Sequence, residues 1–329
     1  MGSAISTPRE WRDDSDFTAA RNAYVVDAGR SYSSAVSSGV SASSLLAATI
    51  TTTSRHPIIV VIDVTGSMQE WPATIRGKLP LLDTYARQIY FDDDAQILFM
   101  AVGDATCDKY PLQGHAFAQG ADLKAELDPT RLKYEGGGGP KTTESYELAA
   151  LYVSHNVSMP NATRPLIIFL GDESPYDEVS PKLAQQFAKV TTERITTAEL
   201  FAKLNKDSDV YFIQKPYSHS TADSLQSLDP ESSAIHADWV KLLGEDHIAI
   251  LRDPNRVVDV ILGIFAKKTG KVDFYHDEIN ERQKPGQVEA AYRSLKTILA
   301  VSPGDPRDHS GKSIMLLEDE DAKPVSRPF

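Results

Sequence analysis

Residues 57–68 read PIIVVIDVTGSM, and this stretch decides the fold expected of the chain. Its first six residues are apolar and mostly β-branched, which is typical of a strand buried on both faces of a sheet. The run passes directly into Asp63, Thr65 and Ser67, which alternate in a turn eased by Gly66. We therefore expect three oxygen-bearing side chains to lie close together at the end of a buried strand.

Strand and helix patterns alternate on the C-terminal side of this stretch. Apolar runs predict strands at 96–102, 165–170, 210–214 and 247–251, with a short edge strand at 114–118. Helical patterns cover 71–90, 143–155, 181–190, 197–204, 234–243 and 253–268. This alternation predicts an α/β fold, doubly wound, with a mainly parallel sheet flanked by helices. In such sheets the working site lies beyond the carboxyl ends of the strands.

The composition limits the function classes. The 329 residues carry 34 Lys and Arg against 46 Asp and Glu, a net charge of −12, which argues against a general nucleic-acid binder. A single cysteine excludes an intrachain disulfide framework. The chain has no run of about 20 apolar residues that could span a bilayer, and its first residues lack the order of a secretory signal. We expect a cytoplasmic protein without a membrane segment.

Three regions of the chain differ in composition and in predicted secondary structure. Residues 1–55 are rich in Ser, Ala and Thr and predict a flexible arm, or one docked on the domain or on a neighbouring subunit. Residues 56–270 hold the α/β pattern. Residues 271–329 begin with a polar connection, continue with one amphipathic helix at 287–299, and end in an acidic, proline-containing tail.

A second strand also ends in an aspartate. The run at 165–170 leads into Gly171, Asp172 and Glu173, so two buried strands present an aspartate at the same edge of the sheet. Between them lie a glycine run at 136–139 and the sequence KTTE at 141–144. Carboxylates and hydroxyls form an oxygen-only ligand set, which Mg²⁺ and Ca²⁺ prefer and Mn²⁺ tolerates. We expect Glu173 to belong to a solvated acidic rim around this edge.

These three pieces resemble the von Willebrand factor type A domain. The segments VIDVTGSM, the glycine-rich turn before a helix, and FLGD follow the family's order over about residues 56 to 270. The resemblance implies a Rossmann-like doubly wound fold that carries a metal-ion-dependent adhesion site. It also implies that an acidic side chain of a partner protein completes the shell of the metal ion.

The family's ligands can be carried over residue by residue. Asp63, Thr65 and Ser67 match the first motif, and Asp172 matches the last aspartate. For the middle ligand, Thr143 would reproduce the family's hydroxyl, whereas Glu144 has the family's spacing to the helix and would add a charge. The expected ion is Mg²⁺, with Mn²⁺ or Ca²⁺ as alternatives.

The resemblance implies a protein-binding adaptor rather than an enzyme, with a MoxR-type AAA+ ATPase as one partner by family analogy. Its oligomeric state is open.

A metal-dependent phosphohydrolase in the same pocket is an alternative, but such enzymes require a second aspartate where this chain has Thr65. A P-loop is disfavoured because Pro140 lacks the amide that such a loop needs. A self-assembling structural protein, joined through the arm at 1–55, is the third reading.

Overall fold

The computed structural model describes residues 45–68, 70–128, 132, 143–217 and 228–300. Six strands form a central sheet in the order β12-β11-β7-β2-β3-β4. They are β2 (Pro57–Asp63), β3 (Gln96–Val102), β4 (Leu112–Ala118), β7 (Leu166–Gly171), β11 (Asp209–Gln214) and β12 (Ile248–Ile250). All neighbouring pairs are parallel except β3 and β4, so the predicted mainly parallel sheet is confirmed.

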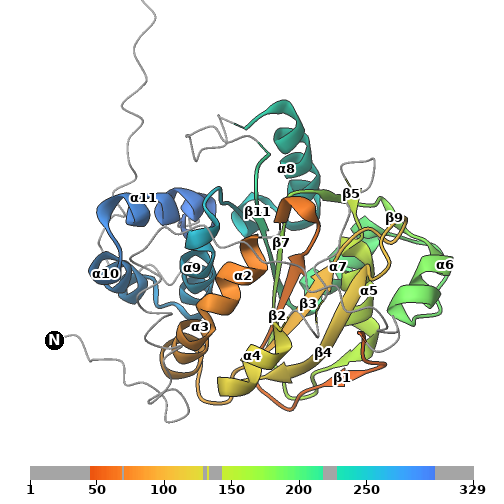
Figure 1. Cartoon of the computed structure of the whole chain (residues 1–329), viewed down its shortest axis with the longest axis horizontal. Helices are drawn as coiled ribbons and strands as arrows, with labels where there is room; N and C mark the ends of the chain where they lie inside the picture. The colour runs from red at the N-terminus through yellow and green to blue at the C-terminus, as the bar shows by residue number, and fades with distance from the viewer. Residues whose placement is uncertain (1–44, 69, 129–131, 133–142, 218–227, 301–329) are drawn as a thin grey trace, which may run out of the picture. The chain divides into compact units, whose positions relative to one another are not determined.

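Helices cover both faces of this sheet (Figure 1). The first face carries α2 (Glu70–Gly77), α3 (Leu79–Tyr85), α9 (Val257–Thr269), α10 (Val272–Arg282) and α11 (Pro285–Ser294). The second face carries α5 (Tyr146–Asn156), α7 (Thr197–Asp207) and α8 (Pro230–Leu243). Strand β2 supplies both cores, because Val60 and Ile62 enter the first whereas Ile59 and Val61 enter the second.

The order of the strands indicates which edge of the sheet would carry a functional site. From β2 the chain moves outward to β3 and β4, and it then returns to add β7, β11 and β12 on the other side of β2. Ile62 of β2 lies beside Leu170 of β7, so these strands end at the same level. A crevice beyond the strand ends is expected where the order reverses in this way.

The predicted helix at 71–90 is divided into α2, α3 and a π-helical turn, η4 (Ala86–Tyr90). The division falls at Lys78, because Pro80 lies in the first turn of α3 and has no amide to continue α2. The predicted helix at 181–190 is likewise shorter, formed by α6 (Pro181–Leu183) and η6 (Ala184–Ala188). At 253–268, Asp253 accepts from the amide of Asn255 at the start of η9 (Pro254–Arg256), which leads into α9.

Part of the N-terminal region is docked. Leu46 bridges to Gly114 of β4, and β1 (Ile50–Thr51) pairs with β6 (Val157–Ser158). Leu45, Leu46 and Ile50 are buried, so the docked alternative describes this segment. Residues 1–44 lie outside the described part of the chain.

The region after 270 contains more helix than the predicted segment at 287–299. Helices α10, α11 and α12 (Lys296–Leu299) follow α9, and Tyr275, Ile279 and Leu295 join the first core. The division of the chain at residue 270 stays a prediction.

The remaining short elements are η3 (Gly66–Met68), η5 (Gly120–Asp122), α4 (Leu123–Glu126), β5 (Thr143–Glu144), β8 (Ser174–Pro175), β9 (Glu178–Val179), β10 (Ile195–Thr196) and η8 (Glu245–His247). Among the described helices, none has the length and apolar character to cross a membrane.

Candidate metal centre

Two aspartates lie at neighbouring strand ends. Asp63 is the last residue of β2 and Asp172 follows β7, and both side chains are 0% exposed. The structure therefore brings these two predicted residues to the same buried edge of the sheet. Buried carboxylates are costly unless hydrogen bonds or cations compensate them, so their partners decide what this edge can bind.

The turn after β2 is organised by the Asp63 carboxylate. Its Oδ1 atom accepts hydrogen bonds from the backbone N of Thr65 at 2.8 Å and from the Thr65 hydroxyl at 2.7 Å. The amide of Met68 donates to the carbonyl of Thr65, which closes the turn into η3. Within this turn Thr65 is buried and Ser67 is exposed. The alternation of oxygen-bearing residues thus produces a hydrogen-bonded turn around one carboxylate.

Tyr146 is a site residue that the sequence analysis missed. Its hydroxyl donates to the second oxygen of Asp63, Oδ2, at 2.9 Å, and its ring packs against Trp239 with 5.3 Å between centroids. Gly171 makes room for it, because a Cβ at that position would lie 1.7 Å from the Tyr146 hydroxyl. The signal in the sequence was a glycine directly before Asp172, but a glycine alone does not name the side chain that fills its space.

The middle segment places two candidate ligands side by side. Thr143 and Glu144 form β5, which pairs with β8 directly after Asp172 and Glu173. Glu144 is only 2% exposed, whereas Thr143 is half-buried. The choice between them stays open. The glycine run at 136–139, Pro140 and Lys141 lie outside the described residues.

Four buried oxygen atoms around this edge lack a hydrogen-bond partner among the described residues. They are Thr143 Oγ1, Glu144 Oε2, Asp172 Oδ1 and Glu173 Oε2. Buried polar atoms are normally hydrogen-bonded, so a cluster of four unsatisfied oxygens requires an explanation. A cation, directly or through water, is the chemistry that oxygen-only groups accept.

Burial, with neighbouring negative charges, raises the pKa values of three carboxyl groups at this edge. Burial, followed by the nearby Asp172 charge, raises the pKa of Asp63 well above its usual range. Burial and the charges of Asp63 and Asp104, among others, raise the pKa of Glu144 strongly. Burial raises the pKa of Glu173 to about 7. Glu173 is half-buried and accepts a hydrogen bond from the Tyr217 hydroxyl. Its place in an acidic rim stays a prediction.

Lys215 supplies positive charge at the site. It follows β11, and its ammonium lies 2.8 Å from Asp172 Oδ2. Its backbone amide donates to the carbonyl of Gly171 at 2.8 Å, which fixes the lysine beside the end of β7. The rule that directed attention to the strand ends applies to β11 as well, but a lysine does not fit an oxygen ligand set and was not singled out.

Asp104, at the end of β3, has a local role. Its Oδ1 atom accepts from the amide of Thr106 at 2.8 Å and from the Tyr176 hydroxyl at 3.0 Å. The first bond is that of a loop turn, and the second joins this loop to Tyr176. Asp104 therefore contributes negative charge to the neighbourhood of Glu144 while its own oxygens are already bonded.

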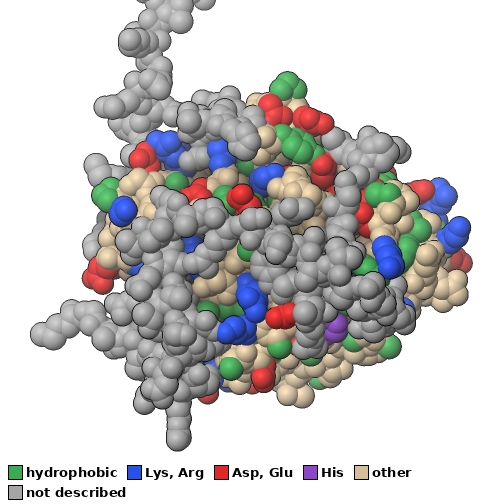
Figure 2. All heavy atoms as spheres, viewed as in Figure 1, with side chains coloured by type: hydrophobic (Ala, Val, Ile, Leu, Met, Phe, Trp, Pro, Cys, Tyr) green, Lys and Arg blue, Asp and Glu red, His purple; other side chains and the backbone are tan. Residues whose placement is uncertain are grey.

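The residues fit a cation that relies on hydroxyls and water. Within the described part of the chain, no three Asp, Glu, His or Cys side chains are grouped so that they could hold a metal ion by themselves. A hard ion at this edge would thus take Asp63 or Asp172 together with the Thr65 and Ser67 hydroxyls, one of Thr143 or Glu144, and water, a set that Mg²⁺ accepts. On the face shown in Figure 2, acidic and basic side chains are interspersed over the described surface.

Comparisons with known proteins leave the family open. No family model matches the chain, and no curated protein matches it. Solved structures that resemble it include the pilus adhesin SpaC from Lactobacillus rhamnosus GG in an open conformation, with 11% identity over 66% of this chain and 30% of that chain and a TM-score of 0.44. Another is proximal thread matrix protein 1 from the mussel byssus, with 11% identity over 68% of this chain and 47% of that chain and a TM-score of 0.42. The chain thus spans less than half the length of either protein, and similarities this distant assign no function.

Proposed function

We propose that this chain contains a von Willebrand factor type A domain of Rossmann-like fold that binds a partner protein through a divalent cation. The observation that carries the proposal is the pair Asp63 and Asp172, both fully buried at neighbouring strand ends. Unpartnered oxygens of Asp172, Thr143 and Glu144 lie around the same edge. The strand order and the helices on both faces are also those that such a domain requires.

In this proposal Asp63, Thr65 and Ser67 hold the ion from the turn after β2. Asp172 and one of Thr143 or Glu144 complete the protein's share, directly or through water. The expected ion is Mg²⁺, and Mn²⁺ or Ca²⁺ could replace it. When bound, the cation would leave a position for a carboxylate from outside the chain.

The proposed role is binding and not catalysis. The partner would be a protein that offers an acidic side chain, and a MoxR-type AAA+ ATPase is one such partner by family analogy alone. The structure-based support for a non-enzymatic role is the first turn itself: Thr65, and not a second aspartate, is bonded to Asp63. A phosphohydrolase of this architecture would need a carboxylate there for proton transfer.

Calorimetric titration tests the site. Metal-stripped full-length protein is titrated with Mg²⁺, Mn²⁺ and Ca²⁺, in parallel with Asp63→Asn and Asp172→Asn, which remove charge but keep the side-chain shape. Both variants should lose most of the affinity, because each removes a carboxylate ligand. Asp104→Asn is the matched control, since this buried carboxylate at a neighbouring strand end is already hydrogen-bonded. It should bind nearly as wild type does.

Two outcomes would contradict the proposal. Wild-type affinity in both ligand variants would show that the site is assigned wrongly. Turnover of phosphate esters in the presence of Mg²⁺, abolished by Asp63→Ala, would replace the binding role with hydrolysis. An affinity pull-down with and without a chelator then addresses the partner, whose capture should require the cation and Asp63.

A further inference from the structure

We propose that Lys215 is an internal cation that competes with the divalent ion for Asp172, so that the metal binds reversibly. This inference rests on the proposed function of the site. The observation behind it is the ion pair in which the Lys215 ammonium lies 2.8 Å from Asp172 Oδ2. The other oxygen of Asp172, Oδ1, is buried and has no hydrogen-bond partner in the described part of the chain.

A backbone hydrogen bond to the end of β7 fixes the position of Lys215. Its amide donates to the carbonyl of Gly171, so its backbone is held next to the residue that precedes Asp172. Its side chain is 21% exposed, whereas that of Asp172 is fully buried. The partly exposed Lys215 side chain therefore reaches a buried carboxylate, and its ammonium can withdraw toward the solvent without unfolding any strand.

The surrounding charges favour exchange over a permanent ion pair. One ammonium faces Asp172, while Asp63 and Glu144 add two further buried carboxylates at the same edge. A divalent ion supplies twice the charge of a lysine and can satisfy several oxygens together. An ammonium and a divalent ion bound to the same carboxylate would repel each other strongly at this burial. We therefore expect metal binding to displace Lys215 from Asp172.

The consequence is a lowered but reversible affinity. Without metal, Lys215 compensates Asp172, so this carboxylate is not left as an unpaired buried charge. With metal, that ion pair must first be broken, and its loss reduces the net gain from binding. Removal of the ammonium should therefore strengthen metal binding rather than weaken it.

The test is a Mn²⁺ titration of the full chain in wild type, Lys215→Met and Lys215→Arg. Since a hydrogen bond to a charged group is broken on binding only in the wild type, Lys215→Met should bind about tenfold to a hundredfold more tightly. Lys215→Arg keeps the charge and should resemble wild type. Lys268→Met is the matched control: Lys268 pairs with Asp209 at the opposite end of β11, and its side chain is 14% exposed. It should leave the affinity unchanged.

A second measurement uses the wild-type chain alone, in case Lys215→Met does not fold. Labelling of Lys215 by an amine-reactive reagent, quantified by mass spectrometry, should increase when Mn²⁺ saturates the protein, because the ammonium is released from Asp172 and becomes accessible to the reagent. Labelling of Lys268 should not change. Unaltered labelling of Lys215 at saturating Mn²⁺ would overturn the displacement.

The outcomes separate this inference from the proposed function. Equal or weaker binding by Lys215→Met, with clear binding by wild type, would overturn the competition and would make Lys215 a residue that positions Asp172. Absence of Mn²⁺ binding in wild type and in Lys215→Met alike would instead remove the metal site itself, and the competition with it.

Discussion

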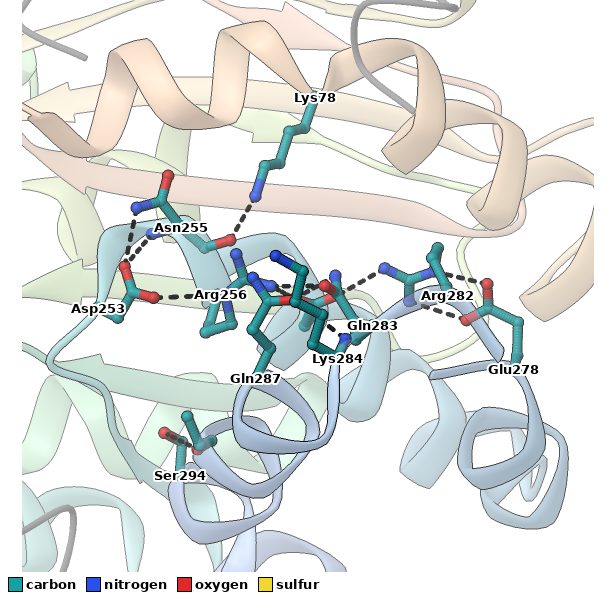
Figure 3. Close-up of polar contacts among 12 residues, drawn as sticks. Lys78, Asp253, Asn255, Arg256, Glu278, Arg282, Gln283, Lys284, Gln287 and Ser294 are labelled. Atoms are coloured by element: carbon teal, nitrogen blue, oxygen red, sulfur yellow. Dashed lines mark hydrogen bonds and ion pairs between the residues drawn. The ribbon is translucent and has the colours of Figure 1, made fainter. Parts of the chain in front are cut away.

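At the scale of single residues, the chain buries charged groups both beyond the strand ends and on one face of the sheet. Asp63, Glu144 and Asp172 are concentrated beyond the strand ends, where an ion is proposed to compensate them. Lys78 is buried on the first face, and its ammonium donates to the carbonyl of Asn255 (Figure 3). The three carboxylates form a candidate site, because buried oxygens of Glu144 and Asp172 lack a hydrogen-bond partner among the described residues. Lys78 lies among Asp253, Asp259 and Arg256 and has a structural role.

Lys78 predicts a stability difference that depends on pH. The side chain is 2% exposed, and burial lowers its pKa from 10.5 to about 8. Between pH 8 and 10.5 the unfolded chain therefore binds a proton that the folded chain does not, so this lysine's contribution to stability rises with pH. Below pH 8 it is protonated in both states and carries its full desolvation cost, roughly 3 kcal/mol from the shift in pKa.

Lys78→Met should remove this dependence. Urea denaturation of wild type and variant at pH 7, 8.5 and 10 gives the difference in free energy of unfolding, in which other titrating groups cancel. The wild type should gain up to about 3 kcal/mol relative to the variant between pH 7 and 10. A difference that stays constant with pH would mean that the buried ammonium keeps its ordinary pKa.

At the scale of elements, the sequence predicts the strands of the central sheet better than it predicts where helices begin. Apolar runs predicted the five strands inside the sheet and at its β12 edge, because strands covered on both faces must be apolar throughout. The other edge strand, β4, is partly exposed and begins two residues before the predicted segment at 114–118. Helix 143–155 was predicted three residues too early: Thr143 and Glu144 pair with β8 as a strand, and α5 begins at Tyr146. That pairing depends on a distant segment, which local periodicity does not register.

The contact between β7 and α5 gives a prediction for Gly171. A Cβ there would lie 1.7 Å from the Tyr146 hydroxyl, so Gly171→Ala must displace the tyrosine from Asp63. We expect a loss of roughly 1–3 kcal/mol in the free energy of unfolding, the usual cost of overpacking, and weaker Mn²⁺ binding. Thermal denaturation and calorimetry measure the two effects.

Gly286→Ala serves as the control for this substitution. Gly286 lies in the first turn of α11, and a Cβ there meets no atom within 4 Å. Alanine should be neutral or stabilising by up to about 1 kcal/mol, because it restricts the unfolded chain and favours the helix. An equal loss of stability in both variants would show that the close approach to Tyr146 is not the cause.

At the scale of the whole described region, a buried polar network joins α9 to the helices that follow it (Figure 3). Asp259 of α9 pairs with Arg282 at 2.6 Å and with Arg256 at 3.3 Å, and it accepts two hydrogen bonds from Gln283. Gln283 in turn accepts from Arg256 at 2.7 Å. The segment from 271 to 299 is therefore attached by buried charges as well as by the apolar contacts of Tyr275.

Asp259→Ala should destabilise the protein strongly. It leaves the Arg256 and Arg282 guanidinium groups without the carboxylate between them, and removal of one partner from a buried ion pair typically costs about 3–5 kcal/mol. Glu289→Ala removes an exposed ion pair with Arg293 on α11 and should cost less than about 1 kcal/mol. Urea denaturation of the full chain compares them, and similar small losses in both would show that the network contributes little.

The sequence by itself determined the strands, the mainly parallel sheet and the edge at which Asp63 and Asp172 meet. Those features follow from local periodicity and from the rule that parallel strands end together, so nearby residues suffice to predict them. Only the tertiary structure placed Tyr146 against Asp63, Lys215 against Asp172 and β5 beside β8. Each of these contacts joins residues 31 to 83 positions apart in the sequence. Such contacts arise from the packing of separate elements, which local periodicity does not encode.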